Sequence, residues 1–123
     1  MDNYLSDIIK NTTDYIEKNI LTDLNLDIIS ENVNVSKFHL LRIWKSTTSY
    51  GLMEYVRKRR IALTLNELME SNTSIEYISY KYKFGCERTY IRIFKEEFQI
   101  TPSKWRKNPI PLNTLDIYNY GNY

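Results

Sequence analysis

Two arginines occupy equivalent places in two similar stretches of the chain. Arg42 and Arg92 each precede an aromatic residue by two positions, and a lysine follows each aromatic residue. A guanidinium group can donate two hydrogen bonds to the O6 and N7 atoms of guanine, and an apolar side chain can contact the methyl group of thymine. Basic and apolar side chains mixed on one helical face therefore indicate contact with base edges in a major groove.

These arginines belong to two copies of one pattern. The first copy is Leu26 to Lys45, LDIISENVNVSKFHLLRIWK, and the second is Ile75 to Lys95, IEYISYKYKFGCERTYIRIFK. Each copy consists of a short helix with periodic apolar residues, a break, and a second helix. The chain is therefore predicted to contain two helix-turn-helix units.

The second helix of each copy is predicted to have one buried and one exposed face. The inward positions are Leu40, Ile43, Trp44 and Thr47 in the first copy, and Tyr90, Ile93, Phe94 and Glu97 in the second. The outward positions are Lys37, Phe38, Leu41, Arg42 and Lys45, followed in the second copy by Glu87, Arg88, Ile91, Arg92 and Lys95. The alternative is that a neighbouring helix partly covers Phe38 and Leu41.

Charge is distributed unevenly along the 123 residues, although the whole chain carries only +2. Met1 to Val35 has a net charge of −5, Ser36 to Arg60 has +6, and Lys81 to Lys107 has +5. A single charged run is usually just a solvated face. Two basic runs at matching places in a repeat favour an electrostatic surface for phosphates.

Helical periodicity predicts an all-α fold of about seven helices. The first helix, Tyr4 to Asn19, has Ile8, Ile9, Thr12 and Ile16 on one stripe. Asn25 and Ser36 are predicted helix caps, Thr73 to Glu76 matches a capping box, and Thr101-Pro102 begins the last helix. The predicted organisation is a first helix-turn-helix subdomain at 1–50, a connecting helix at 51–72, a second subdomain at 73–107, and a tail at 108–123.

The connecting helix has a length that suits two successive grooves. About 20 residues at about 1.5 Å each span about 30 Å, and successive major grooves on one face of a duplex are about 34 Å apart. One chain could therefore bind as a monomer, and its two unlike recognition helices predict an asymmetric site. In the basic cluster Arg57 to Arg60, some side chains are expected to contact phosphates, and one arginine can be structural.

Other classes of function find little support in the sequence. No run of about 18 apolar residues predicts a membrane span, and the start has no secretory signal pattern. The single cysteine, Cys86, excludes an internal disulfide and fits a cytoplasmic protein. No catalytic constellation is present, so an enzyme is not expected. His39 is a lone imidazole without a second ligand, and neither a metal nor a cofactor is predicted.

The combined motifs resemble a known family. They are Ser36, Leu40 to Lys45, Tyr55 and Arg60, and then Ile75, Ile78, Phe84, Arg92 to Lys95, Pro102, Trp105 and Arg106. This pattern is similar to the DNA-binding domain of the AraC/XylS transcription regulators, in particular the MarA, SoxS and Rob group. The resemblance covers about Ile8 to Lys107. It implies a bacterial regulator, usually an activator, that binds double-stranded promoter DNA as a monomer and contacts RNA polymerase.

The resemblance places Phe38, Leu41 and Arg42 in the first recognition helix, and Glu87, Arg88, Thr89 and Arg92 in the second. The full set of predicted DNA-binding residues is Ser36, Lys37, Phe38, His39, Leu41, Arg42, Lys45, Arg57, Glu87, Arg88, Thr89, Ile91, Arg92 and Lys95. Several positions depart from the family pattern. Asn34 and Lys83 replace turn glycines, Leu41 replaces a commonly polar reader, and Glu87 brings a carboxylate towards phosphates.

Two questions remain open at this stage. The tail begins at Asn108 and continues as PIPLNTLDIYNYGNY. It is either a terminal segment that packs back on the domain or the start of a linker to a C-terminal effector domain. A repressor on the same fold is one alternative function. The other is a helical protein- or ligand-interaction module that has lost specific DNA binding. The regulator itself is expected in the cytoplasm, associated with the nucleoid.

Overall fold

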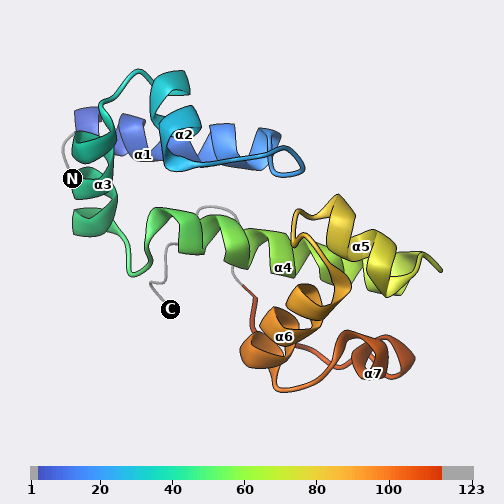
Figure 1. Ribbon diagram of the computed structural model, residues 1–123. Helices are drawn as coiled ribbons and strands as arrows, with labels where there is room; N and C mark the ends of the chain where they lie inside the picture. Colours follow the sequence, from blue (N-terminus) through green and yellow to red (C-terminus); the bar gives the residue numbers. More distant parts are fainter. Residues whose placement is uncertain (1–2, 115–123) are drawn as a thin grey trace. The chain divides into compact units, whose positions relative to one another are not determined.

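The computed structural model describes residues 3–114, and within these residues all regular secondary structure is α-helical. The helices are α1 (Asn3–Lys18), α2 (Leu26–Asn32), α3 (Lys37–Thr47), α4 (Leu52–Glu70), α5 (Ile75–Lys81), α6 (Glu87–Phe98) and α7 (Pro102–Lys107). Figure 1 shows these seven elements along the chain. The predicted all-α fold is confirmed. No helix in the described part is long and apolar enough to cross a membrane.

The chain divides into two compact units whose boundary lies inside α4, between Arg59 and Arg60. In the first unit, α1, α2 and α3 pack against one another. The stripe predicted on α1 is buried, as are residues from each of the other helices: Ile29, Leu40, Trp44, Tyr55 and Val56. Two threonines on α1 are also fully buried, and their hydroxyls donate to carbonyls one turn earlier, Thr12 to Ile8 at 2.7 Å and Thr13 to Ile9 at 2.9 Å. Their burial therefore leaves no unsatisfied hydroxyl donor.

The second unit gathers α5, α6 and α7 around the second half of α4, as Figure 1 shows. Its core contains Ile61, Leu65, Leu68, Ile78, Tyr82, Phe84, Tyr90, Phe94 and Trp105. Aromatic edges meet faces along α6, with the Tyr90 and Phe94 ring centroids 5.8 Å apart and those of Phe94 and Phe98 4.9 Å apart. Such edge-to-face pairs add stability beyond the area that they bury.

The two helix-turn-helix bends use the same backbone device. Asn34 and Lys83 have φ values of 59° and 67°, in the left-handed region. After each of them the chain closes a Schellman motif, in which the amide of Val35 donates to the Ser30 carbonyl at 3.1 Å and that of Phe84 to the Ser79 carbonyl at 2.8 Å. The prediction that these two residues stand where glycine is favoured is confirmed, and Lys83 carries the larger strain because lysine rarely adopts this conformation.

Local signals at the helix starts are mostly confirmed. The side chains of Asn25, Ser36 and Thr101 each accept a backbone hydrogen bond at the start of α2, α3 and α7. The capping box predicted at Thr73 is wrong by one residue, because Ser74 is the cap of α5 and accepts from the Tyr77 amide at 3.0 Å. The Thr73 hydroxyl instead lies 2.8 Å from that of Ser71.

Arg106 on α7 explains how the segment before α5 is held. Its guanidinium donates to the carbonyls of Leu68 at 3.0 Å, Thr73 at 2.6 Å and Ser71 at 3.4 Å. The Leu68 carbonyl lies in the last turn of α4, where a helix leaves its carbonyls without partners inside the helix. Arg106 therefore ties the end of α4 and the entry to α5 to the last helix of the same unit.

Each tryptophan closes the loop that follows its own helix. The indole N–H of Trp44 donates to the Tyr50 carbonyl at 3.0 Å, and that of Trp105 donates to the Ile110 carbonyl at 2.9 Å. Leu112 packs against the core of the second unit, so the first part of the predicted tail lies along that unit. The remainder of the tail, residues 115–123, lies outside the described residues.

Candidate nucleic-acid interface

The outward stripe of α3 is the centre of the candidate interface in the first unit. Phe38, Leu41, Arg42 and Lys45 are all exposed and follow one another at intervals of three, one and three residues. On the opposite face Leu40, Ile43 and Trp44 are buried, so the predicted division of faces is confirmed. Phe38 is 75% exposed and Leu41 is 39% exposed, and neither side chain belongs to the core.

The start of α3 is fixed by neighbouring side chains. Ser36, the cap, accepts from the His39 amide at 3.2 Å. Lys37 is half-buried and forms an ion pair with Asp27 of α2 at 3.2 Å, and its ammonium group lies 5.7 Å from the centre of the Phe38 ring. The half-buried His39 stacks on Tyr4 of α1, with 6.5 Å between ring centroids. This stacking orients the imidazole, and the described residues contain no group of three or more possible metal ligands.

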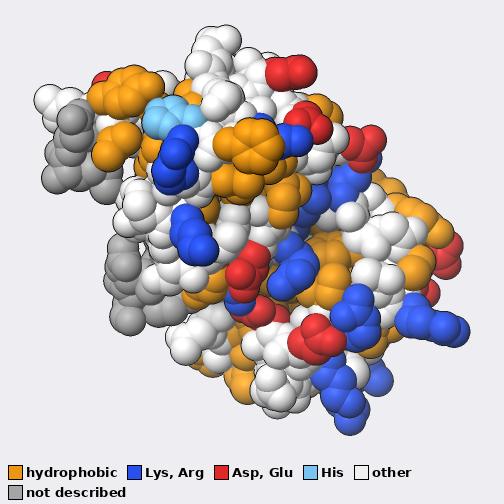
Figure 2. All heavy atoms as spheres, turned by 60° about the vertical axis from the view of Figure 1, so that its left-hand side comes forward, with side chains coloured by type: hydrophobic (Ala, Val, Ile, Leu, Met, Phe, Trp, Pro, Cys, Tyr) orange, Lys and Arg blue, Asp and Glu red, His pale blue; other side chains and the backbone are white. Residues whose placement is uncertain are grey.

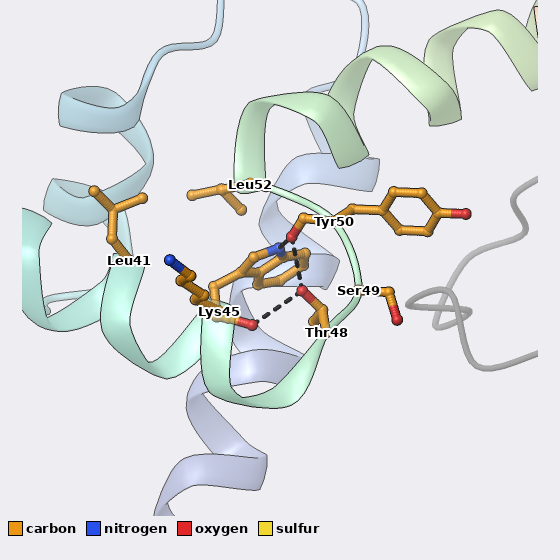
Figure 3. Close-up of a pocket in the computed structure, with 8 residues that line it drawn as sticks. Leu41, Lys45, Thr48, Ser49, Tyr50 and Leu52 are labelled. Atoms are coloured by element: carbon orange, nitrogen blue, oxygen red, sulfur yellow. Dashed lines mark hydrogen bonds between the residues drawn. The ribbon is translucent and has the colours of Figure 1, made fainter.

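The end of α3 borders a pocket of about 560 Å³. Figure 3 shows Leu41 and Lys45 at one side of it and the α3–α4 loop with Leu52 at the other. Beneath them the Thr48 hydroxyl lies 2.9 Å from the Trp44 carbonyl and 2.8 Å from the Tyr50 carbonyl. These bonds, with that of the Trp44 indole, join the end of α3 to the loop that follows it.

The stripe of α6 has the same register as that of α3, fifty residues later. Its positions are Arg88, Ile91, Arg92 and Lys95, of which Ile91 is half-buried and the other three are exposed. Arg92 forms an exposed ion pair with Glu96 at 3.1 Å, one turn further along the helix. Exposed pairs of this kind are weak, so the guanidinium can exchange this partner for a base or a phosphate.

The N-terminal end of α6 carries Glu87, Thr89 and Cys86. Glu87 is exposed and Thr89 is half-buried, and Cys86 is the cap residue but makes no side-chain capping bond. The Cys86 thiol lies 3.2 Å from the Thr89 hydroxyl. The nearby Thr89 hydroxyl, and after it the Thr89 backbone amide, stabilise the thiolate and so lower the pKa of the Cys86 thiol, with smaller contributions from Arg88. The helix start therefore favours negative charge at this position, as helix N-termini do.

The basic cluster on α4 separates into residues of different kinds. Arg57 is exposed, which leaves it available for a phosphate. Arg59 is only 6% exposed and forms a bidentate ion pair with Glu17 of α1, with Nε 3.1 Å from the carboxylate. The Lys58 ammonium lies 5.1 Å from the centre of the Tyr50 ring. The expectation that one arginine of the cluster is structural is confirmed, and that residue is Arg59.

Each unit thus brings its own predicted residues together. In the first unit these are Ser36, Lys37, Phe38, His39, Leu41, Arg42 and Lys45 on one helix, with Arg57 on α4, and in the second they are Glu87, Arg88, Thr89, Ile91, Arg92 and Lys95. In Figure 2, basic side chains on the surface are interspersed with hydrophobic and a few acidic ones. Sequence reasoning did not anticipate the exposure of Tyr77 and Tyr80 on α5, 53% and 57%. The two tyrosines are three residues apart on a helix, a spacing that places them on the same face.

Comparison with known proteins adds independent observations. Residues 29–108 match a family model described as a helix-turn-helix domain. The chain is 37% identical over 111 residues to the multiple antibiotic resistance protein MarA of Escherichia coli strain K12, which covers 86% of this chain and 87% of MarA. It is 32% identical over 112 residues to the HTH-type transcriptional activator AarP of Providencia stuartii, covering 91% and 83% of the two chains.

A solved structure shows the same fold. A transcriptional regulator from Chromobacterium violaceum, described as an AraC-type DNA-binding domain protein, matches with a TM-score of 0.78 at 22% identity. The match covers 89% of this chain and 100% of the other.

Proposed function

Because the chain belongs to the AraC family of helix-turn-helix DNA-binding transcription regulators, we propose that it activates transcription by binding an asymmetric double-stranded site as a monomer. The family is one of regulators and not of enzymes. In this proposal α3 and α6 are the two recognition helices, and each enters a major groove.

One observation carries the proposal. Both units present an exposed basic stripe in the same register, with Arg42 and Arg92 at equivalent places on α3 and α6. The scaffold behind each stripe is similar, because the same Schellman turn precedes each helix and a buried aromatic residue, Trp44 or Phe94, lies at the same position on its opposite face. The stripes themselves differ, since Phe38 and Arg88 occupy equivalent positions. Two unlike readers on one chain favour two unlike half-sites.

Roles for the individual residues follow from their chemistry. Arg42, Arg88 and Arg92 are proposed to donate to base acceptors, and Glu87 to accept from cytosine N4. Phosphates are the proposed partners of the remaining polar residues, which are Ser36, Lys37, His39, Lys45, Arg57, Thr89 and Lys95. RNA polymerase is the proposed protein partner, and the bacterial cytoplasm, at the nucleoid, is the proposed location.

The test begins with selection of bound duplexes from a random pool. The proposal requires two unequal half-sites about one helical turn apart, and one bound chain per duplex by native mass spectrometry. Arg42→Ala should then weaken specific binding by about 1–3 kcal/mol and relax the preference at one position. Lys18→Ala, an exposed basic residue of α1, is the matched control and should leave the preference unchanged. Unchanged affinity of the Arg42 variant, or affinity independent of salt, would contradict the assigned role.

Activation needs its own measurement. AarP, a relative, is named a transcriptional activator. In vitro transcription with bacterial RNA polymerase, from a promoter carrying the selected site, should increase when the protein is added. A decrease would support the repressor alternative on the same fold.

One observation favours an interaction module as a second candidate function. Phe38 is 75% exposed, and aromatic residues are enriched at protein interfaces relative to the rest of the surface. If the random pool yields no enriched sequence, this alternative replaces the proposed one.

A further inference from the structure

The two recognition helices differ most in apolar surface. Phe38 and Leu41 stand at the first and second turns of α3, and Phe38 has the largest exposed fraction of any large hydrophobic residue among those described. The equivalent positions of α6 are Arg88, which is charged, and Ile91, which is half-buried. The first helix therefore presents two exposed apolar groups where the second presents one partly covered group.

The surroundings of α3 hold this apolar surface outward. Lys37 forms an ion pair with Asp27 of α2, and its ammonium group lies over the Phe38 ring at 5.7 Å from the centroid, yet Phe38 remains 75% exposed. Leu41 lies at the edge of the pocket next to Trp44, and 39% of its surface is still exposed. Arg42 is the adjacent exposed residue that can donate hydrogen bonds. A groove bound to this stripe meets two apolar side chains, the Arg42 guanidinium group and, one turn further on, the Lys45 ammonium group.

Only one base offers an apolar partner in the major groove. Thymine carries a 5-methyl group there, whereas guanine, cytosine and adenine present only donors and acceptors. Burying an apolar side chain against a polar base edge would remove that edge from water without giving it a new hydrogen bond, which is unfavourable. Phe38 and Leu41 therefore favour thymine, because its methyl group offers an apolar contact and because the other bases would lose hydrogen bonds to water against these side chains.

From this difference we propose that α3 recognises its half-site through thymine methyl groups. The half-site contains at least two thymines that contact Phe38 and Leu41, beside one guanine bound by Arg42. The half-site of α6 depends on hydrogen bonds instead. This inference rests on the proposed DNA-binding function and adds to it the chemical basis of recognition in one half of the site.

Deoxyuridine provides a direct test, because it lacks only the methyl group of thymine. The half-site of α3 is first identified as the one whose base preference relaxes in Arg42→Ala. Replacing a contacted thymine there by deoxyuridine should weaken binding about fourfold, the effect of one buried methyl group. The same replacement in the half-site of α6 should change affinity less than twofold. A 5-methylcytosine placed at a contacted position should bind more tightly than cytosine.

Two protein variants connect the methyl effect to the side chains. Leu41→Ala and Phe38→Ala should each abolish the deoxyuridine penalty at one position and leave it at the other. Leu21→Ala is the matched control, because Leu21 is an exposed leucine of the same unit, 43% against 39% for Leu41, and lies outside α3. All three positions are exposed, so the variants should fold.

The outcomes separate this inference from the function on which it rests. An enriched two-part site with no deoxyuridine penalty, or with no thymine in the half-site of α3, would overturn methyl recognition and leave the regulator intact. A random pool without any enriched sequence would overturn both. A deoxyuridine penalty that persists in both alanine variants would show that other side chains contact the methyl groups, and would also overturn the proposal.

Discussion

Substitution of the half-buried Arg106 should strongly lower the stability of the second unit. The Arg106 side chain donates to three backbone carbonyls around the end of α4. The bonds to Leu68 and Thr73 have good lengths of 3.0 and 2.6 Å, whereas the 3.4 Å bond to Ser71 is at the limit and should contribute little.

The expected loss can be worked from these contacts. A hydrogen bond to a charged group contributes about 1.5 kcal/mol or more to the net free energy of unfolding. Arg106→Met keeps most of the apolar stem and removes both good bonds, so it should lower the free energy of unfolding by about 3 kcal/mol. Arg106→Lys keeps the charge but not the planar fork, and it should lose about half as much.

Urea unfolding followed by helical circular dichroism measures these losses. Lys104→Met is the control, because Lys104 is an exposed basic residue of the same helix and should change stability by less than about 0.5 kcal/mol. Amide hydrogen exchange should show the largest increase at 71–74 and in α5. The reasoning is refuted if Arg106→Met is as stable as the wild type. If the lysine variant is as stable as the wild type, the charge matters and the fork does not.

Two further predictions concern the left-handed turn residues and the charge of Glu67. Lys83→Gly should stabilise the protein by about 1 kcal/mol, because it relieves a left-handed lysine at φ 67°. Asn34→Gly, at φ 59°, should increase stability less, because asparagine tolerates this region. Equal urea midpoints for Lys83→Gly and the wild type would contradict the strain at Lys83. The hydrogen bond from Lys81 lowers the pKa of the Glu67 carboxyl below its usual 4.5, with a smaller effect from Tyr82. The ionised carboxylate therefore stabilises the fold above pH 4.5, and this contribution disappears as the pH falls through the lowered pKa. Glu67→Gln should thus be less stable than the wild type at pH 7, and the difference should shrink at pH 3; a constant difference between the two urea midpoints would contradict it.

Features encoded within a few residues were predictable from the sequence. Asn25, Ser36 and Thr101 could be assigned as caps because a cap bonds to amides two or three residues ahead. The left-handed position at Asn34 was indicated by the turn between two periodic helices, whereas that at Lys83 was implied only by the family resemblance, in which a glycine usually stands there. The exposed and buried faces of α3 and α6 followed from helical spacing alone.

Features that depend on distant partners were not predictable. Thr73 and Ser74 are both good caps, and the sequence alone favoured Thr73. The Thr73 carbonyl is bound by Arg106, 33 residues later, and α5 starts after Ser74 instead. Likewise nothing local distinguishes Arg59 from the other basic residues of its cluster, since its partner Glu17 is 42 residues away. The bases that we propose Phe38, Arg42 and Arg88 contact could not be predicted either, because they belong to another molecule.

The two buried indoles make the protein its own spectroscopic reporter. Trp44 lies in the core of the first unit and Trp105 in that of the second, and they are the only tryptophans of the chain. Each is held by one hydrogen bond to the loop after its helix, so opening of either loop exposes its indole to water. The fluorescence emission of that indole should then shift to longer wavelength. Selective labelling of the two indoles, for example by fluorine NMR, would therefore distinguish melting of one half of the chain from melting of the other without any added dye.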